Sequence, residues 1–200
     1  VTSIDYRNLP LSDYPADSTT LALVEKIEDN PALKVKVGSF DNALTHIGFA
    51  RLLTTSLTEA TGSELGFYHY GGIRLAEHPA GDVILSTIYN LEPFESKVHT
   101  ITMTPAQMRQ MVIAKYNDTA NPKESHRVDL FSTTPYTIVT DKDGEAVDVI
   151  FAQLREKSKY RVALPDYVGK KYEDIKGDNH TKTDILVVDQ MLKYLNLAPV

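Results

Sequence analysis

The chain has 200 residues, of which 42% are hydrophobic and 24% are charged, and these values predict one globular domain with a sizeable core. Its formal net charge of −6 argues against a polyanionic partner, so we expect no nucleic acid to bind. Cysteine is absent, which excludes disulfide bonds and thiolate metal sites, and no apolar run is long enough to span a membrane.

Residues 1–40 are expected to form an entry arm, and residues 41–200 the main domain. The arm starts with an irregular segment that contains two prolines. A short helix follows, which Asp17 or Ser18 can cap. Charged residues and valines then alternate from Lys34 to Val37, and this pattern predicts a strand.

A long amphipathic helix is expected from Leu44 to Ala60, where apolar residues recur at helical spacing, and Gly62 ends it. The next stretch, Leu65 to Arg74, begins as a short strand and turns at Gly71-Gly72. Adjacent glycines permit positive φ and a close approach of ligand to backbone. Arg74 adds a planar cation suited to a carboxylate or phosphate. The stretch predicts an anion-binding corner, and the alternative is a tight turn with a surface arginine.

Beyond Arg74, local signals predict the elements of an α+β fold, with mixed β-sheets and flanking helices. Thr104–Gln107 is a capping box that starts a helix, and Asp143-Gly144 is a hairpin turn. A closing helix is expected from about Thr183 to Leu195, and Thr181 with Asp184 can cap it. Strands are expected at Lys97–Met103, His126–Phe131, Tyr136–Thr140 and Tyr160–Leu164.

Several short strings occur here in an order that resembles a known family. The strings are Thr61-Gly62, Gly71–Arg74, Gly81-Asp82, Leu91–Phe94, Tyr160–Ala163 and Tyr167. Their order resembles the C-terminal, substrate-specificity domain of the 5'-nucleotidase and UDP-sugar hydrolase family. The resemblance extends from about Val35 to Leu197 and implies the fold of that domain. Its most specific part is GGIR followed by PF.

The resemblance implies a nucleoside-binding cleft. Phe94 and Tyr167 match the two aromatic positions between which the family stacks a nucleobase, and stacking suits any base because every base has a π face. Arg74 and Gly72 belong to the GGIR string at the border of this cleft. Glu173 matches an aspartate that holds the ribose hydroxyls, a contact that a carboxylate can make through two accepted hydrogen bonds. For Phe94, the alternative is packing in the core.

The sequence departs from the family's strings in three places. The arginines that the family carries upstream are missing, and the glycine-rich loop near the end is replaced by Lys170–Ile175. The Gly-Asn that follows PF in the family is Glu95-Ser96 here. Because Glu95 would offset the charge of Arg74, we expect a nucleoside to bind better than a nucleotide.

No catalytic set is recognisable in the sequence. The six histidines are scattered singly, and no serine lies in a nucleophile elbow. In the resembled enzymes a separate N-terminal metallophosphatase domain holds two metal ions and a catalytic Asp-His pair. We therefore expect no cofactor in this chain, and divalent metals in a catalytic domain of the same or a partner chain.

The preferred function is substrate recognition within a metal-dependent 5'-nucleotidase-type phosphoester hydrolase, with a nucleoside or nucleotide as ligand. This chain would bind the nucleoside part by aromatic stacking, and the missing domain would carry out the reaction. The resemblance also implies a periplasmic or extracellular location. Two alternatives stay open: a stand-alone binding module without catalytic function, and a domain retuned for a non-nucleotide substrate.

Overall fold

The computed structural model describes residues 7–118, 130–154, 158–171, 175 and 177–195. The chain divides into two compact units, Val1–Val35 and Lys36–Val200. Within the first unit, Asp17 caps a helix as expected, because its carboxylate accepts the main-chain N–H of Thr20 at 2.8 Å. The elements of this unit are η1 (Leu11–Asp13), α1 (Ser18–Glu28) and η2 (Pro31–Lys34).

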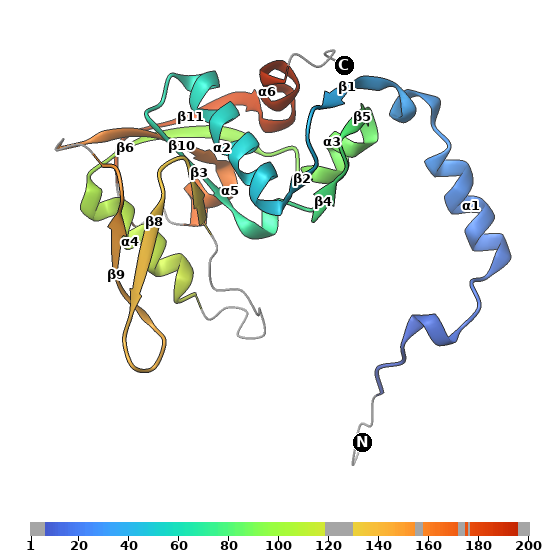
Figure 1. Cartoon of the computed structure of the whole chain (residues 1–200), viewed down its shortest axis with the longest axis horizontal. Coiled ribbons are helices and arrows are strands. Elements are labelled where there is room, and N and C mark those ends of the chain that lie inside the picture. The colour runs from blue at the N-terminus through green and yellow to red at the C-terminus, as the bar shows by residue number, and fades with distance from the viewer. Residues whose placement is uncertain (1–6, 119–129, 155–157, 172–174, 176, 196–200) are drawn as a thin grey trace. The chain divides into compact units, whose positions relative to one another are not determined.

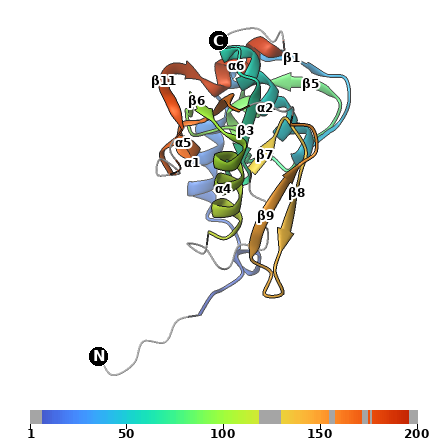
Figure 2. The same cartoon turned by 90° about the vertical axis from the view of Figure 1, so that its left-hand side faces the viewer.

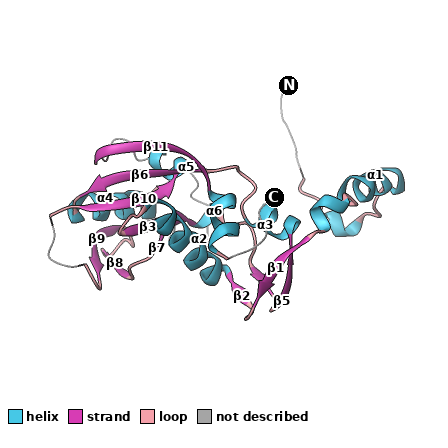
Figure 3. Ribbon diagram, turned by 90° about the horizontal axis from the view of Figure 1, so that it is seen from above, coloured by secondary structure: helices cyan, strands magenta, loops and turns pink. Residues whose placement is uncertain are grey.

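The second unit is built on a five-stranded sheet with the strand order β11-β6-β10-β3-β7, most of which is visible from above in Figure 3. Its strands are β3 (Leu65–His69), β6 (Lys97–Met103), β7 (Leu130–Ser132), β10 (Tyr160–Pro165) and β11 (Asp178–Leu186). β3 and β10 pair in parallel, and the other neighbouring pairs are antiparallel. The sheet is therefore mixed, as the sequence predicted.

Helices cover both faces of this sheet. One hydrophobic core contains side chains of α2 (His46–Thr61) and α6 (Val187–Tyr194). The other contains side chains of α4 (Pro105–Tyr116), α5 (Asp166–Lys171) and the hairpin of β8 (Tyr136–Thr140) and β9 (Ala146–Phe151). Figures 1 and 2 show α4 beside this hairpin. β3 serves both cores, because Leu65 and Phe67 face one and Tyr68 the other.

The second unit also contains two small sheets. β1 (Lys36–Phe40) pairs with β5 (Gly81–Ile84), and β2 (Leu44–Thr45) pairs with β4 (Glu77–His78). The 3-10 turn η3 (Tyr70–Gly72) lies between β2 and β4 in sequence, and the helix α3 (Leu85–Leu91) follows β5 directly. The strand expected from Lys34 begins two residues later, because Lys34 ends η2, whose cap is the Asn30 side chain at 3.0 Å from the Ala32 nitrogen.

Local signals in the sequence predicted several element boundaries correctly. The capping box that begins at Thr104 is formed at the start of α4. Gly62 ends α2 with a φ of 62°, and Gly144 turns the β8–β9 hairpin with a φ of 82°.

Gly66 affects the packing of two elements rather than a turn. A Cβ at Gly66 would lie 2.5 Å from the carbonyl oxygen of Thr54, so the missing side chain lets β3 approach α2 closely.

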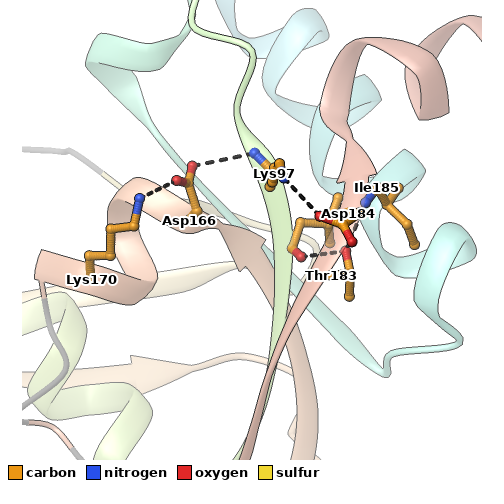
Figure 4. A network of polar contacts seen from close by, with 7 residues as sticks. Lys97, Asp166, Lys170, Thr183, Asp184 and Ile185 are labelled. Carbon is orange, nitrogen blue, oxygen red and sulfur yellow. Dashed lines mark hydrogen bonds and ion pairs between the residues drawn. The ribbon is translucent and has the colours of Figure 1, made fainter.

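The closing helix is shorter than predicted, because residues 183–186 belong to β11. The expected capping role of Asp184 is wrong. Its carboxylate pairs with Nζ of Lys97 at 2.8 Å, and the hydroxyl of Thr183 donates to the carbonyl oxygen of Val98 at 2.7 Å (Figure 4). These cross-strand contacts with β6 favour a strand, and helical spacing of apolar residues does not reveal them.

The strands expected at Lys97–Met103 and Tyr160–Leu164 are confirmed by β6 and β10. The one expected at His126–Phe131 is described only from Leu130, since residues 126–129 lie outside the described residues. Within the described ranges, no helix combines the length and the apolar character that crossing a membrane requires.

Candidate functional site

The candidate site lies at one edge of the main sheet. β3 and β10 run in parallel and end there with His69 and Pro165, and antiparallel β6 begins beside them at Lys97. A cavity of about 790 Å³ opens at this edge, which we call the edge cavity. The residues that line it are His69, Gly71, Arg74, Phe94, Ser96, Asp166, Tyr167, Lys170 and Lys171.

Three of the predicted site residues meet in this cavity. Arg74, Phe94 and Tyr167 come from three separate segments and line the same space. Phe94 is 55% exposed and Tyr167 is 47% exposed, so both rings present free surface rather than packing in a core. Gly72 is not among the lining residues, and Glu173 lies outside the described residues. The ligand contacts expected of these residues stay predictions.

Arg74 joins the two motifs that the sequence singled out. Its main-chain N–H donates to the carbonyl oxygen of Leu91 at 2.9 Å, which ties the GGIR turn to the segment before Phe94. Its guanidinium donates to the carbonyl oxygen of Gly71 at 3.3 Å and lies 5.9 Å from the centroid of the Phe94 ring. No ion pair engages Arg74 within the described ranges.

The two glycines before Arg74 do not act as the sequence indicated. The sequence permits positive φ here, but neither Gly71 nor Gly72 adopts it within the turn η3. The space beside Gly72 is occupied by the ring of His69, whose Cε1 would lie 2.4 Å from a Cβ at that position. Gly71, in contrast, lines the edge cavity, and a Cβ there would meet nothing within 4 Å. Gly72 thus makes room for a side chain of this chain.

Phe94 is followed by an unusual backbone conformation. Glu95 has a φ of 50°, in the left-handed region where a residue with a side chain is disfavoured by about 1–2 kcal/mol. The string that this sequence resembles carries a glycine at this place, the residue type that adopts such a conformation most readily. This turn brings Ser96 back into the cavity wall beside Phe94, while Glu95 itself does not line the cavity.

The short helix α5 carries the charged wall of the cavity. Nζ of Lys170 lies 2.6 Å from Oδ2 of Asp166, and the main-chain N–H of Lys97 donates to Oδ1 at 3.3 Å (Figure 4). Burial raises the pKa of Asp166, but the hydrogen bonds and positive charge of these neighbours, together with His99, hold it below its usual value. Asp166 is therefore ionised at neutral pH and fixes the start of α5 against β6.

The cavity has three cationic lining residues, and two of them are engaged in ion pairs. Arg74, Lys170 and Lys171 line it as cations, and Asp166 is the carboxylate among its lining residues. Lys171 pairs with Asp118, and this contact raises the pKa of the lysine. Glu95, whose charge was expected to offset that of Arg74, is not among the lining residues, and the expected offset stays a prediction.

A buried carboxylic acid lies beneath the cavity wall. Glu92 is fully buried, and Oγ of Ser96 donates to its Oε1 at 2.6 Å. Burial raises the pKa of Glu92, although the hydrogen bonds of Ser96 oppose this effect. Burial and the charge of Glu92 likewise raise the pKa of Tyr68. Since the Ser96 hydroxyl donates its hydrogen bond to Glu92, its oxygen is left to accept hydrogen bonds from the cavity side.

A metal centre is not evident in the described part of the chain, where no three His, Asp or Glu side chains are grouped closely enough to hold an ion. Two histidines do meet, behind α5: Nε2 of His180 lies 3.1 Å from Nδ1 of His99. Burial and the neighbouring ring lower the pKa of His99. This pair packs against Gly169 and supports α5 from the sheet side.

The mixed sheet with helices on both faces defines an α+β domain. The sequence model of the family described as "5'-nucleotidase, C-terminal domain" matches residues 31–176, and the chain belongs to this family. The resemblance found in the sequence is thereby confirmed. The comparison with curated proteins gave no significant match.

Solved structures of nucleotidases share the fold. A 5'-nucleotidase precursor from Thermus thermophilus superposes with a TM-score of 0.65 at 15% identity, over 88% of this chain and 39% of that one. The NAD nucleotidase of Haemophilus influenzae has a TM-score of 0.60 at 15% identity, over 90% and 38%. A 5'-nucleotidase from Candida albicans has a TM-score of 0.51 at 14% identity, over 87% and 42%. This chain therefore spans about two fifths of the length of these proteins.

Sequence reasoning missed most of the charged and polar cavity wall. Lys170 and Lys171 were noted only as replacements of the glycine-rich loop, although their place three and four residues after Tyr167 puts them one helical turn away. His69 ends a predicted strand directly before the glycines, which was a usable signal. No sequence signal placed Ser96 and Asp166 in the cavity wall, because these two residues come close only through the pairing of β6 with β10.

We predict that Glu92→Gln stabilises the protein at pH 8 by about 1 kcal/mol, since burying a charged or unpaired polar group has a cost of this order. The folded-state pKa of Glu92 is raised, so the folded chain holds this proton more tightly than the unfolded chain. Stability from this group is therefore fully present below its ordinary pKa and falls as the pH rises through the folded-state pKa. The gain of the variant should accordingly vanish near pH 4.

Urea unfolding of both proteins at pH 4 and pH 8 measures this difference. Glu95→Gln is the matched control, because Glu95 is exposed and three residues away. A variant that is destabilised at pH 8, or a gain equal at both pH values, would contradict the prediction.

Proposed function

We propose that this chain is the substrate-recognition domain of a metal-dependent 5'-nucleotidase-type phosphoester hydrolase. In this proposal the edge cavity binds a nucleotide, with its base stacked on Phe94 and Tyr167 and its phosphate near Arg74. The observation that carries the proposal is the meeting of these three residues in one cavity of about 790 Å³. Such a volume suits a small-molecule ligand.

The reaction itself is proposed to occur on an N-terminal metallophosphatase domain of the same or a partner chain, which would hold the divalent metals. Phosphoester hydrolysis requires a metal-activated nucleophile and neutralisation of charge at the phosphoryl group. The solved nucleotidases that share this fold are more than twice as long as this chain, which leaves room in them for such a domain. A periplasmic or extracellular location belongs to the same proposal, and the precursor form named for the Thermus protein supports it.

Two alternatives are a stand-alone binding module and a domain retuned for a non-nucleotide substrate. The loss of the family's upstream arginines and of its glycine-rich loop favours the first. The place of Arg74 in the cavity, without an ion-pair partner among the described residues, and the exposure of both rings favour a functional nucleotide site instead.

We predict that Phe94→Ala weakens the binding of both adenosine and AMP by about tenfold or more, because stacking contributes about 1–3 kcal/mol per base. Isothermal titration with each ligand measures the effect. Tyr194→Ala is the matched control, since it removes another exposed aromatic ring that lines a different cavity. Unchanged affinity in Phe94→Ala, with both ligands bound, would place the ligand elsewhere.

We predict that AMP binds more tightly than adenosine and that Arg74→Gln abolishes this preference. The loss should be about tenfold for AMP and absent for adenosine, because a hydrogen bond to a charged group contributes about 1.5–3 kcal/mol. This order of affinities reverses the expectation from sequence, since Arg74 lines the cavity without an ion-pair partner among the described residues, whereas Lys170 and Lys171 are paired with Asp166 and Asp118. The preference should also shrink as salt is added.

The matched control for Arg74→Gln is Arg51→Gln, which removes an exposed arginine beside another cavity. Equal losses for AMP and adenosine would show that Arg74 acts on the shape of the site rather than on the phosphate. A preference of the wild type for adenosine would restore the expectation from sequence.

We predict that the chain alone releases no phosphate from AMP or UDP-glucose, with or without added Mg²⁺, Mn²⁺ or Zn²⁺. The reason is that no metal-binding group is present among the described residues. A phosphate-release assay on pure protein measures this, and Phe94→Ala prepared in parallel reveals contaminating phosphatase as activity common to both. Metal-dependent release that chelator removes and that Phe94→Ala lacks would show that this chain is itself an enzyme.

A further inference from the structure

His69 contacts two tyrosine rings at the wall of the edge cavity. The centroid of its imidazole lies 4.6 Å from that of Tyr167, with 29° between the planes, and 5.4 Å from that of Tyr68, with 20°. Tyr68 is fully buried, whereas Tyr167 is half exposed in the cavity. His69 thus stacks both on Tyr167, an exposed ring of the cavity wall, and on Tyr68, a ring of the core.

Gly72 forms the seat of this imidazole. A Cβ at Gly72 would lie 2.4 Å from Cε1, 2.8 Å from Nε2 and 2.9 Å from Nδ1 of His69. All three distances are shorter than a methyl group tolerates, so any other residue at this position would push the ring away. The seat is specific for a flat ring that lies on the bare backbone of the turn η3.

The imidazole contributes contact rather than charge. Its Nδ1 is buried and has no hydrogen-bond partner in the described part of the chain. Burial, reinforced by the charges of Lys115 and Lys171 against that of Asp166, lowers the pKa of His69 to about 4. The ring is therefore neutral at pH 7, and its stacking faces are what it offers to its neighbours.

We propose that His69 is a positioning residue, which holds the ring of Tyr167 in the cavity wall so that the other face of this ring can receive a base. Tyr167 belongs to the six-residue helix α5 and is 47% exposed; its hydroxyl contacts Lys171, whereas His69 stacks on its ring. The role of Gly72 follows, since it keeps His69 in place behind Tyr167. The consequence for ligands rests on the proposed function, whereas the contact between the rings does not.

A double-mutant cycle in unfolding tests the contact without any ligand. His69→Ala, Tyr167→Ala and the double variant are unfolded in urea. We expect a coupling of about fivefold in the unfolding equilibrium constant, the size typical of an aromatic pair. Additive effects would overturn the inference. His78→Ala serves as control, because this histidine packs against Phe40 and should show no coupling to Tyr167.

The seat is tested by suppression. Gly72→Ala should destabilise the protein strongly, and adding His69→Ala should recover much of the loss, because the methyl group then has room. If Gly72→Ala fails to fold, recovery of folded protein in the double variant gives the same answer. A double variant less stable than Gly72→Ala would contradict the proposed seat.

Binding of adenosine tests the consequence. His69→Ala should weaken adenosine and AMP by the same factor, about fivefold, and His69→Phe should restore both, because a neutral ring replaces a neutral ring. In a Tyr167→Ala background, His69→Ala should have no further effect. Full additivity, or no recovery with Phe, would overturn the positioning role. If the wild type binds neither ligand, the proposed function fails, and the unfolding cycle alone decides the inference about the rings.

Discussion

The candidate site depends on one interaction, the parallel pairing of β3 with β10. Their register joins Leu65 to Val162 and Gly66 to Ala163, so both strands end at the same edge of the sheet. The GGIR turn follows one strand and α5 follows the other, which brings Arg74 and Tyr167 to one cavity although they are far apart in sequence. In open sheets, ligand sites commonly lie where parallel strands end. The pairing itself requires that β3 approach α2 closely, which glycine at position 66 allows.

The opposite wall of the cavity depends on β6 and β11. Lys97 begins β6 and makes two contacts from one residue: its main-chain N–H holds Asp166, and its Nζ pairs with Asp184 on β11 (Figure 4). The exposed ion pair with Asp184 adds little stability by itself. The main-chain contact with Asp166 matters for geometry, because it fixes the start of α5, the helix that carries Tyr167.

Structural features set by contacts between residues close in sequence could be predicted, whereas features set by contacts between distant residues could not. Caps and turns act within a few residues, so the capping box at Thr104 and the turn at Gly144 were found directly. Strands with alternating apolar residues were found as well, among them β6. The end of β11 was misread as helix, because cross-strand contacts of Thr183 override local spacing. The seat of His69 on Gly72 and the approach of Asp166 to Lys97 depend on packing across the fold, which one sequence does not reveal.

Phe94 lies between two features that are unfavourable for folding. Before it, Glu92 is a fully buried acid whose pKa is raised by that burial, and after it, Glu95 holds a left-handed backbone without being glycine. Buried acids and strained backbone of this kind persist mainly where surrounding structure or function requires them. Together they set the position of an exposed ring, which a stable core alone would not require. This concentration of unfavourable features around Phe94 supports its proposed role as one of the stacking residues.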